Sequence, residues 1–205
     1  ALSDTPTQWA LGNGHYLTEF GKTLYLSPLK WVVMFAPLVM VFAFGAALNR
    51  LSVQGATTLF YAFAAVMGIS ISWIFAAYTS FSIIQTFLIT AIAFAGLSLY
   101  GYTTKRDLSG MGTFLMMGLI GLIVASIVNI FLKSGAMQFA ISAIGVLIFA
   151  GLTAFDTQNI KNTYLQLANS DRDFLGKAAI MGALQLYLDF LNLFMFLLQF
   201  LGNRE

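Results

Sequence analysis

The chain has 205 residues, of which 59% are hydrophobic and 9% charged, with a mean hydropathy of +0.83. Soluble domains carry about 25% charged residues, so the composition excludes a soluble globular protein, a disordered chain and a coiled coil. The net charge of +2 comes from scattered residues and indicates no nucleic-acid partner. The absence of cysteine excludes disulfides and thiolate metal sites. What remains is a polytopic helical membrane protein.

The first 28 residues precede the apolar part of the chain. They lack the basic start and the long apolar core of a signal peptide, and the chain opens on Ala1 instead of Met. We expect an N-terminally trimmed or processed chain in which residues 1–28 form an exposed loop or tail.

Six apolar runs follow, and each approaches or exceeds the roughly 20 residues that an α-helix needs to cross about 30 Å of hydrocarbon. They lack the alternation of polar and apolar residues that a transmembrane β-strand requires. The sequence therefore predicts an all-α bundle with one transmembrane domain over residues 29–202 and a tail at 203–205. The predicted spans are 31–48, 56–78, 81–102, 111–132, 136–155 and 178–201.

The connections between these spans are short, except for residues 157–177, which we predict to be an exposed loop whose start could extend the preceding helix. If the spans alternate in direction, six basic residues lie on one side of the membrane and four on the other. Basic residues favour the cytoplasmic side, so the larger group is placed there by a narrow margin. The two groups are Arg50, Lys105, Arg106, Lys161, Arg172 and Lys177, against Lys22, Lys30, Lys133 and Arg204.

Residues three or four positions apart share one helix face, and on this spacing the last two spans each have a polar face. On the fifth span the face consists of Gln138, Ser142, Gly145, Phe149, Thr153 and Asp156, with Phe149 as its one bulky apolar member. On the last span it consists of Gln185, Asp189, Asn192 and Gln199. A stripe of small residues on the fourth span, Gly118, Gly121, Ala125 and Asn129, is typical of close helix packing.

Two acidic residues, Asp156 and Asp189, remain after the loops and tails are assigned. Asp189 lies roughly 16 Å inside its span, where an ionised Asp costs about 2.5–3.5 kcal/mol. Asp156 closes the preceding span, as a plain boundary residue or as a partner of Asp189, since helices joined by a loop are often neighbours. Two carboxyl groups in contact cannot easily both ionise, so they titrate as a unit and would sense pH.

An ionised pair of aspartates needs a positive partner. The candidate salt-bridge partner is Arg50 at the cytoplasmic end of the first span, although an arginine there is also typical of an ordinary membrane anchor. Ca²⁺ is the other candidate, because it prefers carboxylate and carbonyl oxygens. Gln185 and Asn192 would add oxygens on the same face as Asp189.

The motifs around these aspartates are recognisable. Residues 153–160 (TAFDTQNI) and 181–194 (MGALQLYLDFLNLF) closely resemble the carboxyl-terminal signature of the Bax inhibitor 1 / YccA family, the transmembrane Bax inhibitor motif proteins. Residues 100–112 (YGYTTKRDLSGMG) are similar to a loop typical of its bacterial members. The resemblance extends from about Ser27 to Gly202.

The resemblance implies a seven-helix protein of the bacterial inner membrane with a central last helix. Because six spans are present, we expect that the family's first helix lay upstream of residue 1 and was lost. Several members are associated with a Ca²⁺ leak gated by pH through two aspartates, which match Asp156 and Asp189. A basic residue reported to exchange with that pair matches Arg50 less securely. Bacterial relatives are also linked to modulation of the membrane protease FtsH.

The main functional hypothesis is therefore a pH-sensitive Ca²⁺ or cation leak channel, with Ca²⁺ as a permeant or regulatory ion and no tightly bound cofactor. The alternative is a non-conducting modulator of FtsH, in which the tail and loops carry the function. We expect no enzyme, because the Gly-x-Gly-Asp motif of intramembrane aspartyl proteases is absent: Ala154-Phe155 and Tyr187-Leu188 precede the two aspartates.

Overall fold

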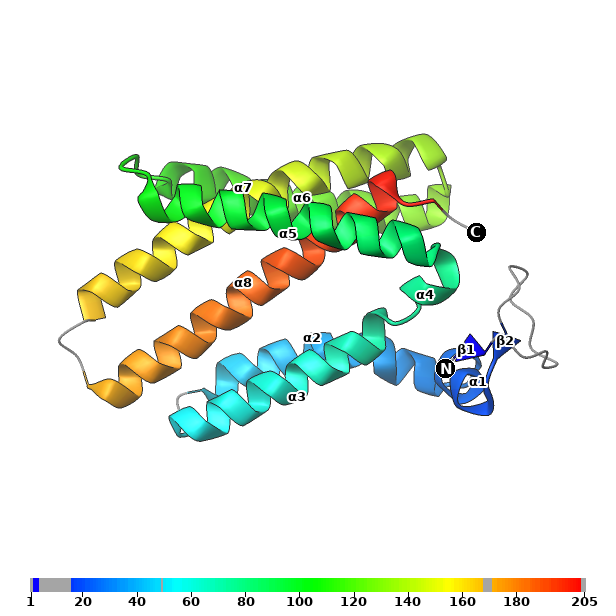
Figure 1. The fold of residues 1–205 in the computed structure, drawn as a ribbon, viewed down its shortest axis with the longest axis horizontal. Coiled ribbons are helices and arrows are strands. Elements are labelled where there is room, and N and C mark those ends of the chain that lie inside the picture. The colour runs from blue at the N-terminus through cyan, green and yellow to red at the C-terminus, as the bar shows by residue number, and fades with distance from the viewer. Residues whose placement is uncertain (1, 4–15, 49, 168–170, 204–205) are drawn as a thin grey trace. The chain divides into compact units, whose positions relative to one another are not determined.

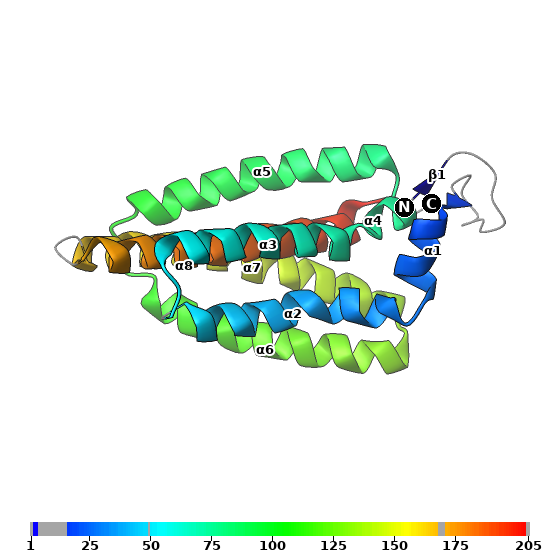
Figure 2. The ribbon, with the colours of Figure 1, turned by 90° about the horizontal axis from the view of Figure 1, so that it is seen from below.

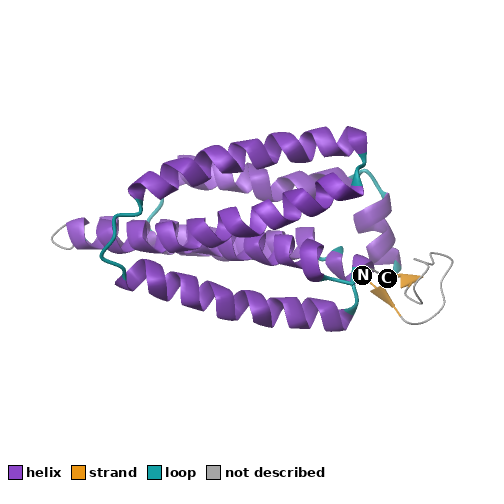
Figure 3. Cartoon of the chain, turned by 90° about the horizontal axis from the view of Figure 1, so that it is seen from above, coloured by secondary structure: helices purple, strands orange, loops and turns teal. Residues whose placement is uncertain are grey.

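A computed structural model describes residues 2–3, 16–48, 50–167 and 171–203. Over these ranges the chain is helical except for a two-stranded antiparallel pair near the N-terminus, in which Leu2 lies opposite Leu17 (Figure 3). The predicted all-α fold is confirmed. The strands are β1 (Leu2–Ser3) and β2 (Tyr16–Leu17); the helices are α1 (Glu19–Leu26), α2 (Leu29–Ala47), α3 (Val53–Ile71), α4 (Ile74–Ala77), α5 (Ser80–Thr103), α6 (Ser109–Leu132), α7 (Gly135–Leu167) and α8 (Arg172–Leu201) (Figure 1).

Six helical segments within the described ranges are long and apolar enough to cross a membrane, as predicted. They are α2, α3 together with α4, α5, α6, α7 and α8. Each of the six segments contains or nearly coincides with the corresponding predicted span. The protein is thus a polytopic helical membrane protein.

The chain divides into two compact units, one formed by residues 1–80 and 203–205 and the other by residues 81–202. In the first unit α1 packs against α2, and α2 against α3. Helix α1 lies inside the segment that was predicted to be an exposed loop or tail. It forms there because the Thr18 hydroxyl caps its first turn, accepting a hydrogen bond from the Gly21 N–H (3.1 Å). The single domain predicted over residues 29–202 stays a prediction.

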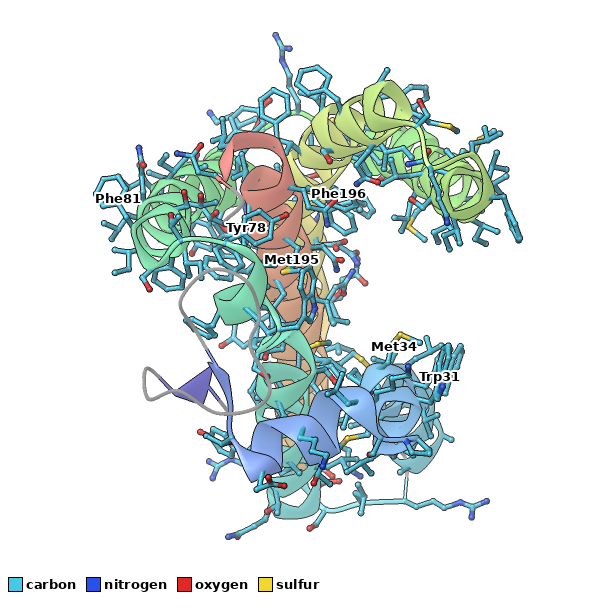
Figure 4. The ribbon with its side chains drawn as sticks, turned by 90° about the vertical axis from the view of Figure 1, so that its right-hand side faces the viewer. Trp31, Met34, Tyr78, Phe81, Met195 and Phe196 are labelled. Atoms are coloured by element: carbon cyan, nitrogen blue, oxygen red, sulfur yellow. The ribbon has the colours of Figure 1, made fainter. Side chains whose placement is uncertain are left out.

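The second unit is built around the antiparallel helices α7 and α8, with α5 and α6 on opposite sides of this pair (Figures 2 and 4). Helix α6 packs against α7. Helix α5 meets α8 through edge-on ring contacts of Phe87 and Phe94 with Phe190, with centroid distances of 5.6 and 5.3 Å. The buried core of this unit consists of Leu115, Leu122, Ile141, Ile148, Phe149, Leu152, Leu193 and Leu197.

The loop predicted over residues 157–177 is wrong for most of its length, because α7 continues to Leu167 and α8 begins at Arg172. At 1.5 Å per residue the 33 residues of α7 span about 50 Å, well beyond about 30 Å of hydrocarbon. The hydropathy of the sequence indicates where a helix leaves the hydrocarbon, but the helix itself can continue beyond that point. Beyond that point α7 is held by Gln158 and Lys161, whose side chains hydrogen-bond to the backbone at the end of α5 and the loop that follows.

Candidate functional site

The two polar faces predicted from residue spacing meet along the α7–α8 pair. We call this line of facing residues the α7–α8 seam. Near one end of it, Gln138 Nε2 donates to Gln199 Oε1 (2.8 Å), and further along, Asp156 meets Asp189. The antiparallel course of the helices explains the pairing: as residue numbers rise along α7, the numbers of the facing residues on α8 fall. The seam consists of Gln138, Ser142, Gly145, Phe149, Thr153 and Asp156 of α7 and Gln185, Asp189, Asn192, Phe196 and Gln199 of α8.

The structure brings the two predicted aspartates together. Asp156 and Asp189 are 4% and 5% exposed, and each carboxyl group is a hydrogen-bonding neighbour of the other. Gln185 is a further neighbour of Asp156. The Oδ2 atom of Asp189 is buried and has no hydrogen-bond partner among the described residues.

No described cation forms an ion pair with either carboxyl group; the ion pair seen in this unit joins Lys177 to Asp173 at the start of α8 (2.8 Å). Two buried carboxyl groups in contact repel each other when both are ionised. Their charge states are therefore linked, and the pair gains or loses protons as a unit.

A cavity of about 570 Å³ lies between the end of α7 and the start of α8. Gln185, the neighbour of Asp156, lines this cavity, as does Thr157. At its rim Lys161 Nζ donates to the backbone oxygen of Tyr102 (2.6 Å) and lies 5.2 Å from the centre of the Tyr102 ring. The polar lining residues are Thr157, Asn159, Lys161, Thr163 and Gln185. The rest of the lining is mostly apolar, and the cavity adjoins the aspartate pair through Gln185.

Near the opposite end of the seam, three amide side chains form a second polar group, which we call the amide cluster: Asn129, Gln138 and Gln199. Asn129 Nδ2 donates to Gln138 Oε1 (3.2 Å), and Gln138 Nε2 donates to Gln199 Oε1 (2.8 Å). The Ser142 hydroxyl also donates to Gln199 Oε1 (3.4 Å), and Asn129 Oδ1 accepts from the Ser134 N–H (3.0 Å). The amides therefore satisfy one another across α6, α7 and α8, as polar groups in hydrocarbon must.

Two other predicted site residues have different surroundings. Asn192 lies one turn from Asp189 on the seam, and its Nδ2 donates to the Leu188 carbonyl of its own helix (2.8 Å). Arg50 belongs to the first unit, in the turn between α2 and α3, with an exposed side chain. Its contact with the aspartates stays a prediction.

Residue spacing alone missed two residues of the second unit. Gln158 was assigned to an exposed loop, but it is 7% exposed: its Oε1 accepts from the Leu108 N–H (2.9 Å) and its Nε2 donates to the Arg106 carbonyl (2.8 Å). Phe196 is not among the residues predicted for the polar face of the last span. Its position four residues after Asn192 and three before Gln199 was the available signal that it lies on the seam.

The chain is similar in sequence to known proteins. The sequence model of the family described as inhibitor of apoptosis-promoting Bax1 matches residues 7–205. A protein of Caulobacter vibrioides is 50% identical over 191 residues, covering 93% of this chain and 76% of the relative. The inner membrane protein YbhL of Escherichia coli K12 is 49% identical over 173 residues, covering 84% and 74%. A protein of Rickettsia prowazekii is 49% identical over 175 residues, covering 85% and 73%.

The similarity to YbhL and the six apolar helices make this a multi-pass protein of the bacterial inner membrane. The family match extends over nearly the whole chain and includes both motifs that contain the aspartates. The chain belongs to the Bax inhibitor family.

Proposed function

We propose that this protein is a pH-sensitive leak channel for Ca²⁺ in the bacterial inner membrane, gated by protonation of the Asp156–Asp189 pair. The observation that carries the proposal is the contact of two buried carboxyl groups on neighbouring helices, beside a cavity lined by the neighbouring Gln185. Ionisable groups inside a membrane span are costly and typically mark ion or proton pathways.

The mechanism follows from the charge of the pair. With a proton between them, the carboxyl groups attract each other and keep α7 and α8 in contact. When that proton leaves at higher pH, two unit charges about 4 Å apart repel by about 4 kcal/mol at an effective dielectric constant of about 20. That energy shifts a helix-packing equilibrium by about a thousandfold. Flux should therefore rise with pH.

The residues around the aspartate pair favour weak, transient binding of Ca²⁺ over tight binding. No group of three His, Cys, Asp or Glu side chains is present in the described part of the chain. Tight Ca²⁺ sites use about 6–8 oxygen ligands. Asp156 and Asp189, with the amide oxygens of Gln185 and Asn192, would reach only the lower end of that range, and only if both carboxylates were bidentate, so we expect Ca²⁺ to bind weakly and leave again.

The test is Ca²⁺ flux into liposomes containing the purified protein, with an indicator inside. Asp189→Asn keeps the side-chain shape and removes the charge, so it should lower the flux at least several-fold at the pH where the wild-type flux is high. A variant that conducts like the wild type at that pH would overturn the proposal.

Asp107→Asn is the matched control for loss of one carboxylate. Asp107 lies outside the spans, and hydrogen bonds from the Ser109 hydroxyl and backbone N–H (2.9 Å to Oδ1) hold its pKa below the usual 3.8. A carboxyl group with a lowered pKa titrates only as the pH falls towards that value, so Asp107 stays ionised at neutral pH. Its substitution should leave both the flux and its pH dependence unchanged.

The predicted alternative, a modulator of FtsH, is distinguished from a channel by combining the flux assay with crosslinking. Lys105 and Arg106 are exposed on the α5–α6 loop, which Gln158 fixes against α7. Flux no higher than in empty liposomes, together with crosslinking from this loop to FtsH in membranes, would favour that function.

A further inference from the structure

The α7–α8 seam is interrupted by one bulky apolar residue on each helix. On α7 this residue is Phe149, and on α8 it is Phe196. The other seam positions are polar or glycine. Each helix therefore places a single aromatic ring in an otherwise small or polar line.

The two rings are in contact. Their centroids are 5.6 Å apart and their planes are inclined by 23°, which is a stacked arrangement. Figure 4 shows Phe196 extending from α8 towards the side on which α6 and α7 lie. Gly145 makes room for it, because a Cβ atom at that position would lie 2.6 Å from the Phe196 ring. Both rings pack with the core that includes Leu193 and Leu197.

The stacked rings lie between the two polar groups of the seam. Along α7, Phe149 is about 10 Å from Asp156 and about 16 Å from Gln138 at 1.5 Å per residue. Along α8, Phe196 lies between Asp189 and Gln199. A hydrated ion moving along the seam from the aspartates to the amide cluster would have to pass the rings.

We infer that the Phe149–Phe196 pair is the hydrophobic constriction of this pathway, separating a compartment at the aspartates from one at the amide cluster. The inference rests on the proposed function, since it assigns the barrier that the aspartates would open. Apolar rings that line a narrow passage exclude water, and an ion cannot cross a dry segment without losing its hydration shell. Repulsion between the aspartates would part α7 from α8 and allow the segment to fill with water.

The test uses thiol accessibility, which requires no ion conduction. The chain has no cysteine, so one introduced cysteine is the only thiol. Gln138→Cys reports on the amide cluster, and Asn192→Cys reports on the segment between the rings and Asp189. Each is treated with a charged, membrane-impermeant methanethiosulfonate reagent in right-side-out spheroplasts and in inverted vesicles.

With both rings present, Asn192→Cys should not react from the side on which Gln138→Cys reacts. Adding Phe196→Ala should make Asn192→Cys react from that side at least tenfold faster. Phe196→Gln should do the same, because it keeps much of the bulk and removes the apolar character. If a folded Phe196→Ala or Phe196→Gln protein leaves the labelling rate unchanged, the constriction is not at these rings.

A matched control is present between the same two helices. Phe139 and Phe200 also contact each other, with ring centroids 5.0 Å apart, but they are 60% and 38% exposed and lie outside the seam. Phe200→Ala should therefore leave Asn192→Cys unreactive from the amide-cluster side. If Phe200→Ala accelerates the labelling of Asn192→Cys as much as Phe196→Ala does, the assignment to the Phe149–Phe196 pair is overturned.

Failure of this inference and failure of the proposed function give different results. If the wild-type protein carries no Ca²⁺, the channel proposal fails, while the labelling of Asn192→Cys still decides whether the rings separate two compartments. If Asp189→Asn lowers the flux but removing the Phe196 ring changes neither labelling nor flux, the channel proposal stands and the constriction is refuted.

Discussion

Asp189 has a carboxylate oxygen that is buried and without a hydrogen-bond partner among the described residues. A buried polar atom left unsatisfied costs about 1–3 kcal/mol, and more if it is charged. An asparagine or leucine there would avoid the cost of a charge. An unpaired carboxylate oxygen that becomes accessible when α7 and α8 part would suit transient binding of a cation, and the proposed function gives Asp189 Oδ2 this role.

Gln158 provides a prediction at the residue scale. Gln158→Leu removes both hydrogen bonds to the loop backbone at Arg106 and Leu108 without changing the side-chain volume much, and should weaken the attachment of the loop by about 1–3 kcal/mol. Trypsin cleavage after Lys105 and Arg106 should become about tenfold faster or more in detergent-solubilised protein.

Asn159→Leu is the control for this substitution, because Asn159 is the exposed neighbour of Gln158 on the same helix. It should leave the cleavage rate unchanged. Equal rates in the Gln158→Leu and wild-type proteins would show that these two hydrogen bonds do not hold the loop.

Individual site residues were predictable to the extent that their chemistry is unusual for a membrane span. Asp156, Asp189 and Gln185 could be identified because a carboxylate or amide in hydrocarbon requires a partner. Phe196 was missed because phenylalanine is abundant in apolar helices, so its spacing from Asn192 and Gln199 was a weak signal, and its contact with Phe149 is what distinguishes it. Gln158 was missed because its partners are backbone atoms of a distant loop, which leave no pattern in side-chain spacing.

At the scale of helices, α5 and α7 approach each other closely at Gly101. A Cβ atom at Gly101 would lie 2.1 Å from the backbone oxygen of Ala154, so the two backbones touch there. Gly101→Ala must push the helices apart. We expect a loss of about 1–3 kcal/mol in unfolding free energy, seen as a lower midpoint of denaturation in detergent.

The control for Gly101→Ala is Gly96→Ala in the same helix, where a Cβ atom would meet nothing within 4 Å. This substitution should be neutral or slightly stabilising, because alanine favours the helix more than glycine does. If both variants unfold at the same midpoint, the crossing of α5 and α7 tolerates a side chain and the structure is wrong at this contact.

The number of candidate membrane spans could be predicted from hydropathy, whereas the lengths and contacts of the helices could not. The thickness of the hydrocarbon sets the minimum length of an apolar run that can span it, so the six segments could be identified. Helix α7 extends beyond its run, where Gln158 and Lys161 hydrogen-bond to the backbone of α5 and its following loop. Helix α8 begins before its run, with the Lys177–Asp173 ion pair in its first turns. The small-residue stripe identified Gly118, where an added Cβ atom would lie 3.1 Å from the Ile148 side chain. It also identified Gly121, where an added Cβ atom would meet nothing within 4 Å, and it did not identify Gly101.

At the scale of the whole molecule, scarcity of charge links composition to function. The chain has 8 acidic residues, and Asp156 and Asp189 are the two that lie buried within the described spans. A single protonation event at their contact can therefore dominate the response of the membrane-spanning part to pH. Arg50, the predicted partner of the ionised pair, belongs to the first unit, whereas both aspartates belong to the second.

The most direct test of the central claim is the Ca²⁺ flux through reconstituted protein, measured from about pH 6 to about pH 8, one unit on either side of neutral. The proteins compared are the wild type, Asp156→Asn, Asp189→Asn and the double variant. If the two carboxyl groups act as one gate, the wild-type flux rises with pH, either single substitution flattens the profile, and the double substitution adds nothing further. Single variants that keep the wild-type pH profile, or two effects that simply add, would contradict the account.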